Sequence, residues 1–195
     1  MNIVDRFINY TRINTTTHRE NGAAGIMPSS LGQMELAKII AAELTQLGLQ
    51  DIVLCESAII TATLPSNSAK KIPTVAFFGH LDTSAEQSND THAHIVNYTG
   101  GDIVLNPALN IVLKQAEFPE LSQYQNQDII VTDGTSLLGA DDKAAIAAIM
   151  HALTVLIANP DIEHGDVKGA IIHKEEQGLR GAKAFHVETK KNKIK

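Results

Sequence analysis

Two continuous apolar runs constrain the fold of this chain more than any other feature of its sequence. Residues 73–79 read PTVAFFG, and residues 167–173 read VKGAIIH. Runs of this kind are typical of strands that are buried on both faces of a parallel sheet. Segments with helical periodicity alternate with them, at residues 2–13, 30–48, 142–158 and 180–185. The alternation predicts an α/β fold with a mostly parallel central sheet flanked by helices.

Shorter elements fill the intervals between these segments. Strands are expected at residues 51–55, 59–64, 103–105 and 128–132, and loops at residues 14–28 and 80–101. The helix over residues 30–48 carries an apolar stripe, which predicts its buried side: Leu31, Met34, Ala37, Ile40, Ala41, Leu44 and Leu47.

Composition restricts the class of protein and of partner. The 195 residues suffice for one sizeable domain with its own core. A net charge of -6 and an aromatic content of 4% without Trp disfavour nucleic acid, which needs a basic face or stacking rings. No apolar run approaches the roughly 20 residues of a membrane span, and the N-terminus lacks the pattern of a signal peptide. Since Cys55 is the single cysteine, no internal disulfide can form. We therefore expect a cytoplasmic protein that binds neither nucleic acid nor membrane.

Acidic and imidazole side chains follow the predicted strands. His80 and Asp82 come directly after the first apolar run, and Glu175 and Glu176 come directly after the second. Asp141 lies between a loop and the start of a predicted helix. Sites in open α/β sheets form at the carboxyl ends of strands. One edge of the sheet is therefore expected to collect an imidazole and several carboxylates.

These residue types suit a zinc centre. His80 can supply an imidazole nitrogen to zinc, and Asp82, two residues on, can accept a hydrogen bond from the other ring N–H. Asp141 has two oxygens and can bridge metal ions about 3.5–4 Å apart. Of Glu175 and Glu176, one can bind metal while the other takes a proton from water. The residues predict a dinuclear zinc site of a hydrolase.

Three ordered motifs carry a resemblance to a known family. GHLD, TDGTSLLGADDKAA and EEQGLRGAKAF closely resemble the tripeptide aminopeptidases of the M20 di-zinc metallopeptidase family. The resemblance extends to about residue 187 and covers roughly the first half of a family member. It implies an incomplete zinc-peptidase-like catalytic domain over residues 1–187, without the family's lid and dimerisation domain. Residues 188–195 are expected to form a basic, frayed tail.

The resemblance also implies roles for individual residues. His80 resembles a ligand of one zinc ion and Glu176 a ligand of the other, with Asp141 bridging the two. Asp82 is similar to the residue that orients the histidine, and Glu175 to the general base. The implied reaction releases the N-terminal residue of a tripeptide through a water activated by two zinc ions. A homodimer is one possible assembly.

Three positions near the motifs need separate comment. Lys174 stands where the family usually has an acidic residue. A lysine directed inward would favour the ionised form of Glu175 and weaken it as a base. Ala145 replaces a usual glycine and would crowd the backbone near the metals. Asp142 is expected to cap the helix or to interact with its dipole.

The number of ligands limits what the chain is expected to do by itself. One metal has His80 and Asp141, and the other has Asp141 and Glu176, whereas a catalytic zinc takes three protein ligands. We therefore expect weak or partial zinc occupancy and little peptidase activity from the chain alone. Two alternatives stay open: a folded remnant without catalytic activity, and another amidohydrolase of the same family, such as a deacylase.

Overall fold

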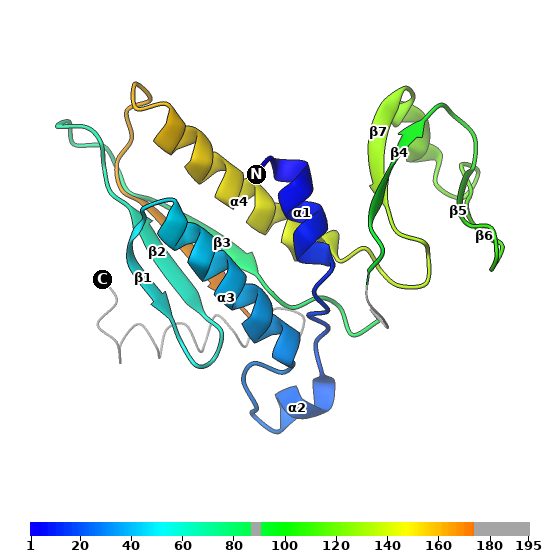
Figure 1. The fold of residues 1–195 in the computed structure, drawn as a ribbon, viewed down its shortest axis with the longest axis horizontal. Helices are drawn as coiled ribbons and strands as arrows, with labels where there is room; N and C mark the ends of the chain where they lie inside the picture. The colour runs from blue at the N-terminus through cyan, green and yellow to red at the C-terminus, as the bar shows by residue number, and fades with distance from the viewer. Residues whose placement is uncertain (87–90, 174–195) are drawn as a thin grey trace.

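The computed structural model describes residues 1–86 and 91–173, in which helices cover one face of a four-stranded sheet (Figure 1). The helices are α1 (Ile3–Thr11), α2 (Arg19–Ala23), α3 (Leu31–Gln46) and α4 (Ala140–Ala158), with a 3-10 helix η1 (Pro119–Tyr124). The strands of the main sheet are β1 (Gln50–Leu54), β2 (Ile60–Leu64), β3 (Val75–His80) and β8 (Val167–Ile172). The other strands are β4 (His94–Tyr98), β5 (Ile103–Asn106), β6 (Ile111–Leu113) and β7 (Gln127–Val131).

The main sheet has the strand order β1-β2-β8-β3. Strand β3 runs parallel to β8, whereas β1 with β2 and β2 with β8 are antiparallel. The predicted α/β class is confirmed. The expectation of a mostly parallel sheet is wrong for the described residues, because only one of the three pairs is parallel. The short connection between β1 and β2 forces an antiparallel hairpin, since a parallel pair needs a long crossover.

One hydrophobic core joins the helices to the sheet. It contains Phe7 and Tyr10 of α1, a stripe of α3, the inner side of α4 and the β2–β8 region. The buried apolar residues of α3 are Leu36, Ala37, Ile40 and Leu44, of which the last three were predicted. The predicted Met34, Ala41 and Leu47 are partly buried against the same core. The first predicted member, Leu31, is 90% exposed instead. It lies in the first turn of the helix, beside a surface pocket.

Strand β3 differs from its prediction in burial. The run was expected to be covered on both faces, but Phe77 is 39% and Phe78 is 58% exposed. Only its last two residues, Gly79 and His80, are buried. Among the described strands, β3 is at the edge of the sheet, so that its side chains lack the cover a central strand receives.

A smaller layer of strands lies to one side of the main sheet (Figure 1). Two antiparallel pairs, β4 with β7 and β5 with β6, enclose a separate cluster around Tyr98, Ile103 and Leu121. Strand β4 lies within the segment expected to be a loop at residues 80–101, and helix α2 lies within the expected loop at residues 14–28. Both elements are short and have no clear apolar periodicity, which is why the pattern of the sequence does not reveal them.

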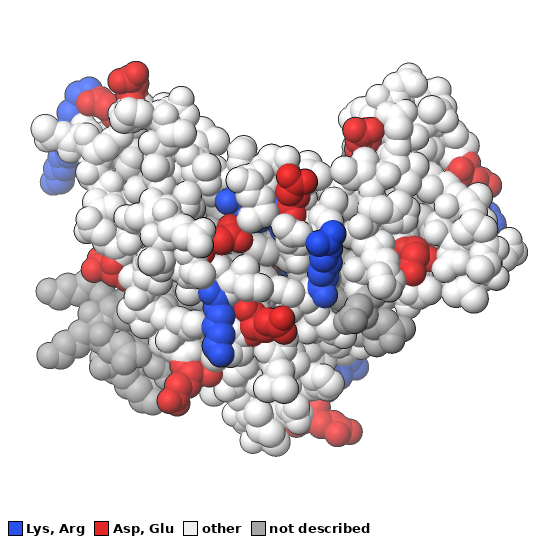
Figure 2. Space-filling view, viewed as in Figure 1, with Lys and Arg blue, Asp and Glu red and all other residues white. Residues whose placement is uncertain are grey.

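Some predictions fall outside the described residues, namely the helix at residues 180–185 and the boundary between residues 187 and 188. No helix in the described part is long and apolar enough to cross a membrane. On the face seen in Figure 2, acidic and basic side chains are interspersed.

Candidate metal centre

The end of β3 and the start of α4 bring the first two candidate ligands together. His80 is the last residue of β3. Asp141 is the second residue of α4, yet its dihedral angles are extended, with φ -87 and ψ 103. Gly139, just before the helix, has a φ of 71, a left-handed conformation that glycine adopts without strain. The chain therefore turns sharply before α4 and presents Asp141 from a non-helical position.

The two side chains are in direct contact. Nε2 of His80 lies 3.1 Å from Oδ1 of Asp141. The side chain of His80 is 10% exposed, whereas that of Asp141 is 84% exposed. The pair thus combines a fixed, largely buried ring with a carboxylate that solvent, a metal ion or a substrate can reach.

Asp82 holds the other nitrogen of the ring, but through its main chain. The Nδ1 atom of His80 lies 2.8 Å from the carbonyl oxygen of Asp82, and 3.6 Å from Oδ1 of the same residue. The carboxylate distance is too long for a hydrogen bond. The expected hydrogen bond to the Asp82 carboxylate is therefore replaced by one to its carbonyl. Because a carbonyl can only accept, Nδ1 is the protonated nitrogen, and Nε2 faces Asp141.

Electrostatics favour a proton on His80. Burial by itself would lower the pKa of His80, but the hydrogen bonding and charge of Asp82, together with the charge of Asp142, raise that pKa to about 9. Without metal, the ring is therefore an imidazolium at neutral pH that can donate from Nε2 to Asp141. A metal ion that binds Nε2 must displace this proton.

Lys143 follows Asp142 in α4. It is fully buried, and its Nζ donates to the carbonyl oxygen of Ile13 at 2.7 Å. Burial lowers the pKa of Lys143 to about 7. A signal for its burial exists in the sequence: Lys143 precedes Ile146, Ala147 and Met150 at the helical spacing of one buried face.

The segment after α1 is hydrogen-bonded to the loop that follows His80. The amide of Thr17 donates to the carbonyl of Thr83 at 2.9 Å, and the amide of Thr83 donates to the carbonyl of Thr15 at 3.2 Å. The fully buried side chain of Gln33 donates to the same Thr15 carbonyl at 3.2 Å. The loop containing Asp82 is thereby connected through Thr15 to the start of α3.

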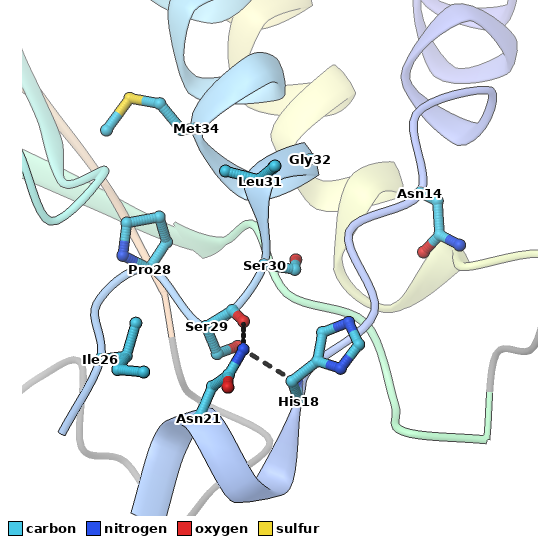
Figure 3. A pocket seen from close by; sticks show the side chains of 10 residues that line it. All are labelled: Asn14, His18, Asn21, Ile26, Pro28, Ser29, Ser30, Leu31, Gly32 and Met34. Atoms are coloured by element: carbon cyan, nitrogen blue, oxygen red, sulfur yellow. Dashed lines mark hydrogen bonds between the residues drawn. The ribbon is translucent and has the colours of Figure 1, made fainter. Parts of the chain in front are cut away.

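A pocket of about 600 Å³ lies at the start of α3 (Figure 3). Its wall includes His18, Ile26 and Met34, and Nδ2 of Asn21 donates to the carbonyl of Ser29 at 2.9 Å beside it. None of the predicted ligands lines this pocket. The contact between His80 and Asp141, rather than the pocket, is the candidate site.

The donor set fits part of a zinc centre. An imidazole nitrogen and a carboxylate that converge from two elements are two of the ligands that zinc takes. Within residues 1–86 and 91–173, no group of three or more His, Cys, Asp or Glu side chains could hold a metal ion. Glu175 and Glu176 lie outside the described residues, so their roles, like the metal itself, stay predictions.

Comparison with known proteins gives sequence relatives along almost the whole chain. The chain is 45% identical over 189 residues to a protein named peptidase T of Parabacteroides distasonis. It is 46% identical over 191 residues to a protein of the same name from Alkaliphilus oremlandii. In both cases the match covers 96% of this chain and 46% of the relative. The chain thus spans about half the length of these relatives. No family model matches it.

Solved structures show the same fold. The chain superimposes on aminopeptidase PepT of Bacillus cereus with a TM-score of 0.62 and 24% identity, over 93% of this chain and 38% of the other. A tripeptidase of Staphylococcus aureus gives a TM-score of 0.60 and 23% identity with the same coverage. Over almost its whole length, the chain is therefore similar to proteins named peptidase T, of which it matches 46%.

Proposed function

We propose that this chain forms part of a metal-dependent aminopeptidase that releases the N-terminal residue of tripeptides. The observation that carries the proposal is the 3.1 Å contact between Nε2 of His80 and Oδ1 of Asp141. Support comes from the relatives: the curated ones are named peptidase T, and the structural ones an aminopeptidase and a tripeptidase. From these names we infer that the substrates are peptides.

The residues that would hold zinc come from three segments. His80 would bind one ion through Nε2, Asp141 would bridge two ions, and Glu176 would bind the second. Zinc held there would act as a Lewis acid toward the first peptide carbonyl and would lower the pKa of a water molecule.

The chain's own residues have separate tasks in this reaction. The carbonyl of Asp82 holds the ring of His80 through Nδ1, at 2.8 Å, so that Nε2 keeps its direction. Glu175 would take a proton from the attacking water at its carboxylate and pass it to the leaving amine. The carboxylate of Asp141 is exposed to solvent, so a substrate would be able to approach the site from this side.

We further propose that the chain alone is a weak catalyst. Of the proposed ligands, one zinc ion would have His80 and Asp141 and the other Asp141 and Glu176, whereas a catalytic zinc takes three from the protein. Calorimetric titration of the chain with zinc tests this ligand count. Weak binding that is lost in His80→Ala is expected, whereas two tight sites in the unmodified chain would contradict it.

A chimera tests the activity itself. This chain would replace its matching part in the Parabacteroides distasonis peptidase T, and the chimera would be assayed for release of the N-terminal residue from tripeptides. We expect zinc-dependent hydrolysis that is lost in the Asp141→Ala chimera and kept in Asp161→Ala, an exposed carboxylate after α4. A soluble, folded chimera without tripeptidase activity would overturn the proposal. Hydrolysis of N-acyl amino acids in its place would favour a deacylase.

A further inference from the structure

Asp142 lies in the first turn of α4, where an acidic side chain suits the helix dipole, and its carboxylate also contacts the main chain of the neighbouring strand. Its Oδ2 accepts a hydrogen bond from the backbone amide of His80 at 3.1 Å. The next amide along the chain, that of Leu81, donates to the carbonyl of Ile172 in β8. Successive amides of a strand point to opposite sides. The amide of His80 therefore points away from β8, toward the side on which no described strand pairs with β3.

Gly79 makes room for this contact. A Cβ atom at Gly79 would lie 3.3 Å from Oδ2 of Asp142 and 3.1 Å from Cγ1 of Ile146. A side chain at Gly79 would require these neighbouring atoms to shift by a few tenths of an ångström. The absence of a side chain at Gly79 thus allows the carboxylate of Asp142 to reach the amide of His80.

The consequence is that His80 is held at three points. Asp142 accepts from its amide, the carbonyl of Asp82 accepts from Nδ1, and Asp141 faces Nε2. Asp141 and Asp142 are adjacent, so one dipeptide contacts both the main chain and the ring of the same histidine. A shift of the His80 backbone would change the distance between Nε2 and Asp141 directly.

We propose that Asp142 is a positioning residue, whose carboxylate fixes the backbone of His80 and thereby the spacing between the His80 ring and Asp141. The metal-binding part of this inference rests on the proposed function, while the positioning part concerns the metal-free protein. Groups that orient metal ligands typically change metal affinity by about 10–100-fold when they are removed.

The experiment compares Asp142→Ala, which removes the acceptor, with Asp142→Asn, which keeps an acceptor oxygen at the same reach. Asp161→Ala is the control for loss of one exposed carboxylate. In metal-free protein, amide hydrogen exchange at His80 is measured by NMR. We expect exchange about tenfold faster in Asp142→Ala, as for loss of one hydrogen bond, and close to that of the unmodified chain in the other two variants. Unchanged exchange in Asp142→Ala would overturn the proposal.

Zinc titration of the same proteins tests the metal-binding part. We expect Asp142→Ala to weaken binding by about 10–100-fold, and Asp142→Asn to stay within a few-fold of the unmodified chain. Faster amide exchange at His80 with unchanged zinc affinity would contradict the claim that the position of the His80 backbone determines zinc binding. If the unmodified chain bound no zinc, the proposed metal site would fail, and the exchange measurement would still decide whether Asp142 positions His80.

A further variant keeps the experiment decisive if Asp142→Ala misfolds. If Asp142→Ala does not fold, Asp142→Glu takes its place, because one extra methylene displaces the acceptor oxygen without removing the charge. It is expected to show faster exchange at His80 than Asp142→Asn. Equal protection in both variants would contradict a role that depends on the position of the oxygen.

Discussion

Nε2 of His80 and Oδ1 of Asp141 lie 3.1 Å apart, although 61 positions separate the two residues in the sequence. The ring belongs to the end of β3 and the carboxylate to the start of α4, which packs against β3. In the metal-free protein this contact is an ion pair, because the raised pKa of His80, about 9, keeps the ring protonated. The same two atoms are the ones proposed to bind zinc.

Zinc binding should therefore depend strongly on pH. The pKa of His80 is about 9, so at any lower pH a metal ion must displace one proton from Nε2. Each pH unit lost between pH 8.5 and 6.5 should weaken zinc affinity by about tenfold, measured in metal-buffered titrations. His80→Ala should bind weakly at all of these pH values, with a smaller pH dependence. A pH-independent affinity in the unmodified chain would contradict binding through His80.

Two buried groups should affect the stability of the metal-free protein in opposite directions. The pKa of His80 is raised from 6.5 to about 9, so its stabilising contribution is complete below pH 6.5 and is lost as pH rises through 9. The pKa of Lys143 is lowered from 10.5 to about 7. Below pH 7 the buried charge of Lys143 lowers the free energy of unfolding by its full amount. As the pH rises from 7 toward 10.5, this loss of stability disappears.

Between pH 7 and 9 the two effects should largely cancel, since each changes the free energy of unfolding by at most about 1.4 kcal/mol per pH unit. Urea unfolding in the presence of a chelator measures this. We expect a nearly flat profile for the unmodified chain, falling stability with pH for Lys143→Met, and rising stability with pH for His80→Gln. Parallel profiles for the three proteins would show that one or both pKa values are not shifted in this way.

Gly79 should be sensitive to a single added methyl group. The Cβ of alanine there would lie 3.1 Å from Cγ1 of Ile146 and 3.3 Å from Oδ2 of Asp142, closer than side-chain contacts normally are. We expect Gly79→Ala to lower the free energy of unfolding by about 1–3 kcal/mol, the usual cost of overpacking. Gly169 on the adjacent strand β8 is a matched control, because no atom of the described residues, apart from its chain neighbours, lies within 4 Å of its Cβ position. Equal losses in the two variants would contradict a specific close contact at Gly79.

Local patterns predict much of this fold because they depend on neighbouring residues. The helices α1, α3 and α4 and the strands β3 and β8 follow from their apolar spacing. The antiparallel pairing of β2 with β8 does not, because it depends on how distant segments meet. Leu31 shows the same limit: its spacing matches the stripe of α3, but its side chain is 90% exposed.

The candidate site was predictable in its members but not in its contacts. Residue type and position after a strand single out His80, Asp82 and Asp141. The sequence does not indicate that Asp82 uses its carbonyl, because this depends on the local bend of the chain. Nor does it indicate that Asp142 reaches the amide of His80, because side-chain patterns carry no information about unpaired main-chain amides.

A buried ion pair between α1 and α3 should contribute far more to stability than an exposed one. Nε of Arg6 lies 2.8 Å from Oε2 of Glu43, with side chains 4% and 13% exposed, and the hydroxyl of Tyr10 donates to Oε1 of the same glutamate. Removing one partner leaves a charge without compensation in a poorly solvated place. Arg6→Ala should therefore lower the free energy of unfolding by about 3 kcal/mol, measured by urea denaturation.

Lys70 and Glu163 provide the exposed comparison. Their side chains also form an ion pair, but they are 71% and 46% exposed. Lys70→Ala should lower the free energy of unfolding by less than about 1 kcal/mol, since water and salt screen the pair. The double variant Arg6→Met with Glu43→Leu should recover most of the loss seen in Arg6→Ala, because it removes both charges and keeps the packing volume. If the double variant were less stable than Arg6→Ala, the cost would lie in lost packing between α1 and α3 rather than in the unpaired charge.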